Sequence, residues 1–144
     1  MRDLVAAFES AVLPRLAWTH AAHVTVAFWY VVWYGPESAL DRVRGGIRRY
    51  NAAHGIAQTP TGGYHETLTR FYVWAVRRHL RGARADCSLA ELANGAVAAL
   101  ADRTLPLRYY SWERLFSWEA RTTWVDCRSC CIKVCGNCTG SHRL

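Results

Sequence analysis

The 144-residue sequence contains almost no lysine: Lys133 is the only one, so nearly all of its basic side chains are arginines. The formal net charge is +7, and many of the arginines fall in two separate groups, within residues 42–49 and 77–84. Each group is spaced like the solvated face of a helix, whereas nucleic-acid-binding proteins usually gather basic and base-stacking aromatic residues on one face. Nucleic acid is therefore an unlikely partner by charge, and a nucleic-acid-associated protein is only the third hypothesis.

The sequence also lacks a hydrophobic run long enough to cross a membrane. Its most apolar stretch, residues 24–34, is only half of the roughly 20 residues that a transmembrane helix needs. The first 13 residues carry Asp3 and Glu9 and have no basic segment in front of an apolar one, so we expect no secretory signal. These absences predict a cytoplasmic protein without a membrane partner.

No stretch alternates apolar and polar residues over the length of a β-strand. Apolar residues instead recur at helical spacing, and they predict helices over residues 2–13, 20–34, 37–54, 64–80 and 88–102. The second of these is apolar nearly all round, which is typical of a central helix. Residues 108–124 are rich in aromatics and predict two short helical pieces packed over the others. The prediction is an all-α, single-domain bundle of about five helices over residues 1–126, with an irregular Cys-rich tail over residues 127–144.

Local signals mark where several of these helices begin and end. Gly35-Pro36 stops one helix and starts the next, so the two are expected to be antiparallel neighbours. Ser88 and Glu91 have the spacing of a capping box. Gly45-Gly46, within the third helix, indicates either a departure from a straight helix or a close approach of another element.

Two predicted helix starts carry the most distinctive chemistry. His20 and His23 are three residues apart and project from one helix face, and His65 lies on the buried stripe of a second helix, next to Glu66. Imidazoles from two helices, with a carboxylate, form a ligand set that zinc, iron, manganese or copper would accept, and helical bundles often build metal sites in this way. The side chains expected to line the approach are Trp18, Tyr64 and Arg70.

The leading hypothesis is therefore a small metalloprotein, specifically a metal-dependent enzyme acting on a small molecule. His20, His23, His65 and Glu66 would be ligands, with Glu66 alternatively the catalytic general base. The same residues are also compatible with a non-catalytic ligand-binding or interaction module, in which they form a hydrogen-bonded polar core. His65-Glu66 lacks the second histidine of the HExxH pattern, because Thr69 stands at that position.

Cysteine is scarce before residue 127, where only Cys87 occurs, but five cysteines crowd into the tail. They include two CxxC pairs, a pattern typical of metal sites, yet only four residues separate the pairs, where zinc ribbons leave about 15–20. A secondary thiolate site for zinc or copper(I) and an appendage without ordered structure both remain open. The candidate ligands of that site are Cys127, Cys130, Cys135 and Cys138.

Five short motifs lie within residues 13–125: WTHAAH at 18–23, YN at 50–51, GYHETLT at 63–69, LPLRYYS at 105–111 and RLFS at 114–117. In these motifs the segment resembles an uncharacterised family of small bacterial proteins. No established activity is attached to that family, so the resemblance implies no catalytic assignment. It implies that Tyr109, Tyr110 and Ser111 belong to the same unit as the histidines. The Cys-rich tail departs from the family's pattern.

Overall fold

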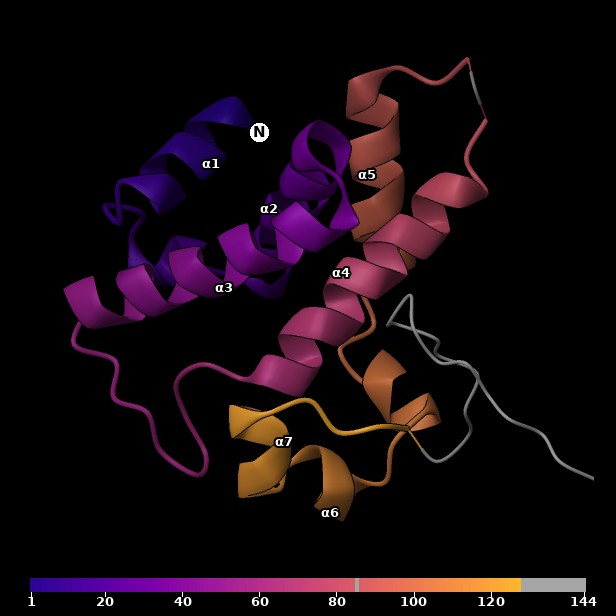
Figure 1. The fold of residues 1–144 in the computed structure, drawn as a ribbon. Helices are drawn as coiled ribbons and strands as arrows, with labels where there is room; N and C mark the ends of the chain where they lie inside the picture. The colour runs from indigo at the N-terminus through magenta and orange to yellow at the C-terminus, as the bar shows by residue number, and fades with distance from the viewer. Residues whose placement is uncertain (85, 128–144) are drawn as a thin grey trace, which may run out of the picture.

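Every regular element in the described part of the chain is helical. The structure is a computed structural model that describes residues 1–84 and 86–127, and these residues contain seven α-helices and two short 3-10 helices but no β-strand (Figure 1). The α-helices are α1 (Arg2–Glu9), α2 (His20–Tyr34), α3 (Pro36–Ala53), α4 (Glu66–Arg81), α5 (Leu89–Ala99), α6 (Trp112–Leu115) and α7 (Trp118–Thr122). The 3-10 helices are η1 (Arg15–Ala17) and η2 (Leu105–Arg108).

The predicted all-α class is confirmed for this part of the chain, with seven α-helices in place of about five. Helices α1 to α5 lie where the apolar periodicity predicts them, and α6 and α7 are the two short pieces expected in residues 108–124. The capping box at Ser88 and Glu91 is present. No helix in the described residues is long and apolar enough to cross a membrane.

Helix α2 is the central element of the bundle. Thr19 caps its start by accepting a hydrogen bond from the backbone N–H of Ala22, and Gly35, with φ of 74°, ends it. Pro36 then opens α3 at once, so α2 and α3 form the expected antiparallel pair. Helix α2 contacts α1, α3, α4 and α5, which explains why its side chains are apolar nearly all round.

Gly46 provides the close approach that the double glycine indicates. A Cβ atom at Gly46 would lie 2.5 Å from Cε1 of Phe8, whose ring is fully buried between α1 and α3. A Cβ atom at Gly45 would have no neighbour within 4 Å. Only the second glycine is therefore required by packing, and α3 continues through both of them as one helix.

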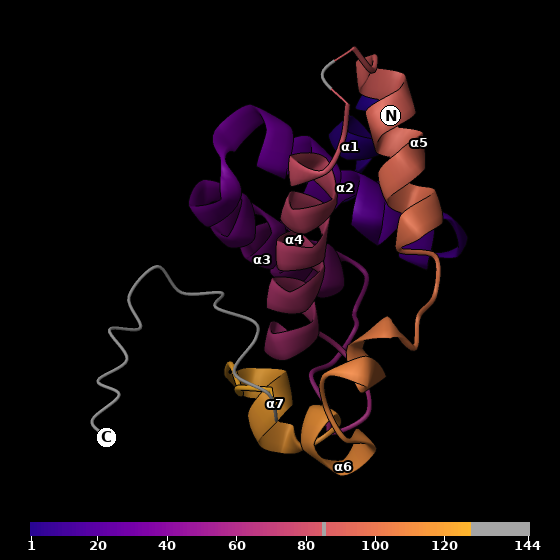
Figure 2. The same ribbon diagram turned by 90° about the vertical axis from the view of Figure 1, so that its right-hand side faces the viewer.

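Residues 105–127, which we call the C-terminal layer, pack along α4, from η2 (Leu105–Arg108) beside its C-terminal half to α7 at its first turns. Figures 1 and 2 both show α6 and α7 at the N-terminal end of that helix. The fully buried Thr67 hydroxyl donates to the carbonyl of Thr123 at 3.0 Å and accepts from the N–H of Val125 at 3.3 Å. Tyr110 donates to the carbonyl of Val125 at 3.1 Å. Hydrogen bonds between side chains and backbone groups thus hold this layer on α4. The layer places α7 beside the loop that precedes α4.

Candidate functional site

The two histidines of α2 each donate a hydrogen bond to a different backbone carbonyl and do not face a common site. His20 donates from Nε2 to the carbonyl of Leu100, at 2.7 Å, and so ties the start of α2 to the end of α5. His23 donates from Nδ1 to the carbonyl of Thr19, at 2.8 Å, and its ring lies 3.8 Å from that of Trp18, centroid to centroid. Burial lowers the pKa of His23 to about 4, so it is neutral at pH 7.

His65 uses both of its ring nitrogens. It is the N-cap residue of α4: Nδ1 accepts from the backbone N–H of Leu68 at 3.3 Å, and Nε2 donates to the carbonyl of Leu115 at 3.0 Å. Burial, together with the nearby charge of Arg121, lowers the pKa of His65 to about 4. The neutral ring is the form that can accept at one nitrogen while donating at the other. No lone pair is left over for a metal in this arrangement.

Glu66 is buried within an ion-pair network. Its carboxylate accepts from Arg44 Nε at 3.0 Å, from Arg44 Nη2 at 2.7 Å and from the Tyr64 hydroxyl at 2.7 Å, and Arg70 Nε lies 3.9 Å away. Burial by itself raises the pKa of Glu66, but these donors outweigh it and the pKa is lowered. A carboxylate stabilised in this way is a poor general base, since its lone pairs are already engaged.

The predicted metal site is therefore not assembled in the described residues. They contain no group of three or more His, Cys, Asp or Glu side chains placed to hold a metal ion. His20 and His23 contact α5 and Trp18, whereas His65 and Glu66 contact the C-terminal layer and α3. Cys127 is buried, and the other three cysteines predicted as ligands, Cys130, Cys135 and Cys138, lie outside the described residues.

The three residues predicted to line a pocket have separate positions. Trp18 stacks on Phe8, at 4.5 Å between ring centroids, and packs within the aromatic core. Arg70 pairs with Glu66 and lies over the ring of Trp124. Tyr64 does line a cavity, but a different one from the predicted metal pocket.

The cavity beside Tyr64, which we call the α3–α7 cavity, has a volume of about 360 Å³. It lies between the last turns of α3, the loop over residues 54–65 and α7, and Figure 1 shows that loop running from the end of α3 past α7 to the start of α4. Two of its lining residues are arginines, and none is acidic. The lining residues are Arg48, Asn51, Ala52, Ile56, Gln58, Tyr64, Arg121 and Thr122.

Arg121 is the decisive residue of this cavity. Its side chain comes from α7 and is 6% exposed, and it donates from Nε to the carbonyl of Pro60 at 3.0 Å and from Nη1 to that of Gly62 at 3.2 Å. No carboxylate pairs with it within the described residues, and burial lowers its pKa. Arg48 adds a second guanidinium, centred 4.9 Å from the ring centroid of Tyr64.

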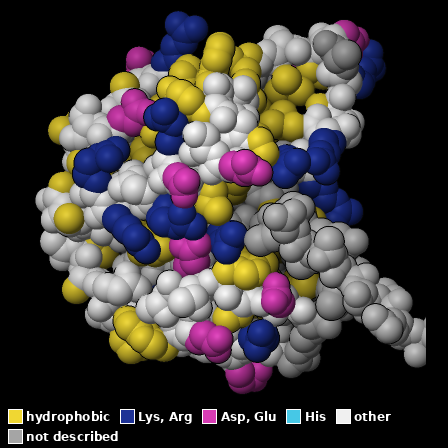
Figure 3. Space-filling model, viewed as in Figure 1, with side chains coloured by type: hydrophobic (Ala, Val, Ile, Leu, Met, Phe, Trp, Pro, Cys, Tyr) yellow, Lys and Arg dark blue, Asp and Glu magenta, His cyan; other side chains and the backbone are white. Residues whose placement is uncertain are grey.

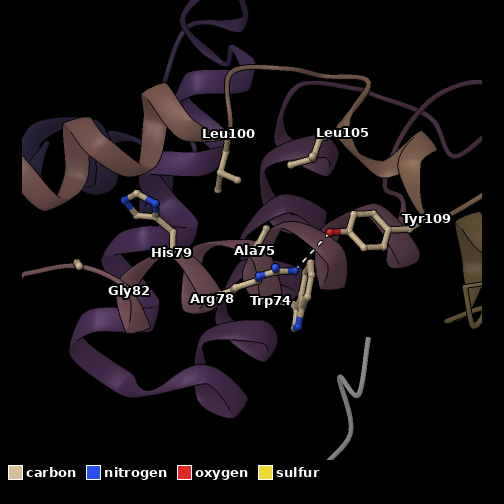
Figure 4. A pocket seen from close by; sticks show the side chains of 9 residues that line it. Trp74, Ala75, Arg78, His79, Gly82, Leu100, Leu105 and Tyr109 are labelled. Carbon is tan, nitrogen blue, oxygen red and sulfur yellow. Dashed lines mark hydrogen bonds between the residues drawn. The ribbon is translucent and has the colours of Figure 1, made fainter. Parts of the chain in front are cut away.

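A second cavity, of about 390 Å³, lies between the C-terminal half of α4, the end of α5 and η2 (Figure 4). Its arginine, Arg78, already donates to the Tyr109 hydroxyl at 3.4 Å and lies 5.4 Å from the ring centroid of Trp74. Its buried lining residues, Ala75 and Leu100, are apolar. This cavity therefore lacks the buried, unneutralised charge of the α3–α7 cavity.

The surface charge does not gather into one basic face. Figure 3 shows basic side chains with acidic ones interspersed among many of them, and the densest basic group lies over the C-terminal half of α4. That helix carries Arg77, Arg78 and Arg81. The view agrees with the helix-face interpretation of the arginine groups.

No protein-family model, curated protein or solved structure matches this chain. The resemblance drawn from the motifs thus stays a prediction, and function must be argued from the geometry. The motif YN contains Asn51, a lining residue that the sequence analysis did not single out. Arg121 carries no local signal, because it is one arginine among many and its burial depends on a loop 60 residues earlier in the chain.

Proposed function

We propose that this protein is a non-catalytic ligand-binding protein whose α3–α7 cavity takes a small organic anion. The observation that carries the proposal is the buried guanidinium of Arg121, which lines the cavity without a carboxylate partner in the described residues. Buried charges in proteins are usually paired. The carbonyls of Pro60 and Gly62 satisfy two hydrogen-bonding positions of Arg121 but supply no formal negative charge. An anionic ligand would supply it.

The rest of the lining indicates the kind of anion. A volume of about 360 Å³ falls at the lower end of the range for small-molecule sites. Ala52, Ile56 and the ring of Tyr64 also line the cavity and give it apolar surface, so the proposed ligand is a carboxylate or phosphate with a small apolar body. Arg48 would contribute a second positive charge to its recognition.

The lining supports binding rather than catalysis. The Tyr64 hydroxyl donates a hydrogen bond to the Glu66 carboxylate. Burial and that hydrogen bond raise the pKa of Tyr64 to about 12. The other ionisable lining residues are Arg48 and Arg121. The lining contains no His, Asp, Glu, Lys or Cys, the side chains that, with tyrosine, usually serve as general acids and bases near neutral pH.

Calorimetric titration with a panel of small carboxylates and phosphate esters tests this proposal. We expect binding that weakens roughly tenfold in Arg48→Gln, because one charge-assisted contact is lost. Arg77→Gln is the matched control, since Arg77 is an exposed arginine of α4 outside the cavity. Arg121→Lys should also weaken binding, because lysine keeps the charge but not the fork that reaches both carbonyls.

Absence of binding across the panel, or equal losses in Arg48→Gln and Arg77→Gln, would contradict the proposal. Elemental analysis of the same purified protein tests the alternative hypothesis from the sequence, that the protein is a metal-dependent enzyme. Stoichiometric zinc, iron, manganese or copper, lost on His65→Ala, would favour that enzyme over the binding protein.

A further inference from the structure

The α3–α7 cavity contains two side-chain amides in contrasting states. Gln58 is fully occupied by the protein: its Nε2 donates to the carbonyl of Tyr64 at 2.9 Å, and its Oε1 accepts from the N–H of the same residue at 2.8 Å. Asn51 is 9% exposed, in the last turn of α3, and its side-chain amide has no hydrogen-bond partner among the described residues. One amide therefore builds the loop, and the other is available to a ligand.

The amide of Asn51 can form hydrogen bonds with a ligand through two different atoms. Its Nδ2 has two N–H groups to donate, and its Oδ1 accepts. Water can reach both of these atoms, so a ligand that displaces this water must supply equivalent hydrogen bonds or lose affinity. A simple anion can accept from Nδ2 but offers nothing to Oδ1, which carries a partial negative charge and repels it. A ligand that satisfies both atoms must also carry a donor.

We infer that the α3–α7 cavity prefers anions that carry an O–H or N–H donor next to the charged group, with Asn51 as the residue that selects for it. This inference rests on the proposed anion-binding function and names the class of ligand: hydroxy or amido carboxylates, or phosphates that retain a proton. Arg48 and Arg121 would attract the negative group of the ligand, and Asn51 Oδ1 would accept a hydrogen bond from the donor next to that group. Sites that hydrogen-bond a ligand hydroxyl discriminate strongly against analogues that lack it.

Two matched pairs of probes test this selectivity on the full chain. Near pH 7 inorganic phosphate retains a P–OH proton while sulfate has none, and the two ions are close in size and shape. Mandelate differs from phenylacetate by one hydroxyl next to the carboxylate, and its ring can lie against Ile56. We expect the donor-bearing member of each pair to bind at least about tenfold more tightly to the wild-type protein.

The variant Asn51→Leu separates the contribution of the Asn51 amide from that of the two arginines. Leucine has a similar volume and no polar atoms, so we expect the tenfold preference within each pair to fall to about one. Urea unfolding of the same variant checks that it is folded at the temperature of the titration. If the variant does not fold, the ratio within each pair on the wild-type protein still decides the inference.

The outcomes separate the inference from the function on which it rests. Equal affinity for both members of each pair, with binding still weakened by Arg48→Gln, would overturn the donor rule and leave the anion-binding function in place. A preference that persists in Asn51→Leu would overturn the role of Asn51 as the selecting residue. Failure of all four probes to bind the wild-type protein would remove the inference and count against the proposed function as well.

Discussion

At the scale of single residues, several polar side chains of the motifs make hydrogen bonds to backbone far away in the chain. His65 is the clearest case, because one nitrogen caps its own helix and the other reaches Leu115, 50 residues later. Making both bonds at once requires the neutral ring, because a protonated ring donates at both nitrogens and accepts at neither. Protonation would put a hydrogen on Nδ1, where the N–H of Leu68 now points.

The pH dependence of stability tests this reading of His65. The pKa of His65 is lowered from 6.5 to about 4, so the unfolded chain takes up a proton at a higher pH than the folded one. The stabilisation is complete above pH 6.5 and is lost as the pH falls toward 4. We expect His65 to account for about 2 kcal/mol of lost unfolding free energy between pH 6.5 and 4.5.

His65→Asn is the variant to compare, since asparagine caps helices well but does not titrate in this range. Urea unfolding at several pH values should show a shallower acid dependence in the variant than in the wild type. His23, whose pKa is also lowered to about 4, is present in both proteins and supplies the residual slope. An unchanged slope would mean that His65 does not need to be neutral in the folded state.

The limits of sequence interpretation are also visible at this scale. The pattern correctly placed His65 on the buried side of its helix start, and its neighbour Glu66 is buried there as well. It could not show that Arg44, 22 residues earlier, donates hydrogen bonds to both oxygens of Glu66. Nor could it show that the carbonyl of Leu115 accepts a hydrogen bond from His65. Metal ligands and structural caps require the same residue types at the same burial, and only the partners distinguish them.

At the scale of the elements, helix boundaries were predictable because their signals are local. The capping box of α5 and the Gly-Pro boundary between α2 and α3 each depend on residues within one or two turns. The α3–α7 cavity was not predictable, because it depends on how a loop meets α7. No periodicity or spacing encodes that meeting.

The two glycines of α3 make a paired test of element packing. Gly46→Ala should lower the unfolding free energy by about 1–3 kcal/mol, because its Cβ would overlap the fully buried ring of Phe8. Gly45→Ala should raise it by about 0.5–1 kcal/mol, since alanine favours a helix and has free space there. Chemical denaturation of both variants under one set of conditions gives the comparison. Losses of equal size would mean that α1 does not approach α3 as closely as described.

At the scale of the whole molecule, α1 to α5 form the bundle and the C-terminal layer closes one end of it. Thr67 joins the two parts through its pair of hydrogen bonds to Thr123 and Val125. Thr67→Val keeps the shape of the side chain but removes both bonds, and we expect a loss of about 1–3 kcal/mol.

Hydrogen exchange locates that loss. In Thr67→Val, amides of α6, α7 and residues 123–127 should exchange faster than in the wild type, while those of α2 and α3 change little. Thr25→Val is the control, because the Thr25 hydroxyl bonds only within its own helix, to the carbonyl of Ala21. Faster exchange spread evenly over the chain would show that the layer and the bundle unfold as one unit.

Most of the side-chain hydrogen bonds that hold the C-terminal layer and the loop before α4 end on carbonyl oxygens. Arg121 binds those of Pro60 and Gly62, and His65 binds that of Leu115. Every amino acid has a carbonyl, so many substitutions at the accepting positions leave these bonds in place. Evolution could therefore vary much of the loop while a few donors keep its course. Substitutions in this loop could therefore change the ligand preference of the cavity without changing the fold.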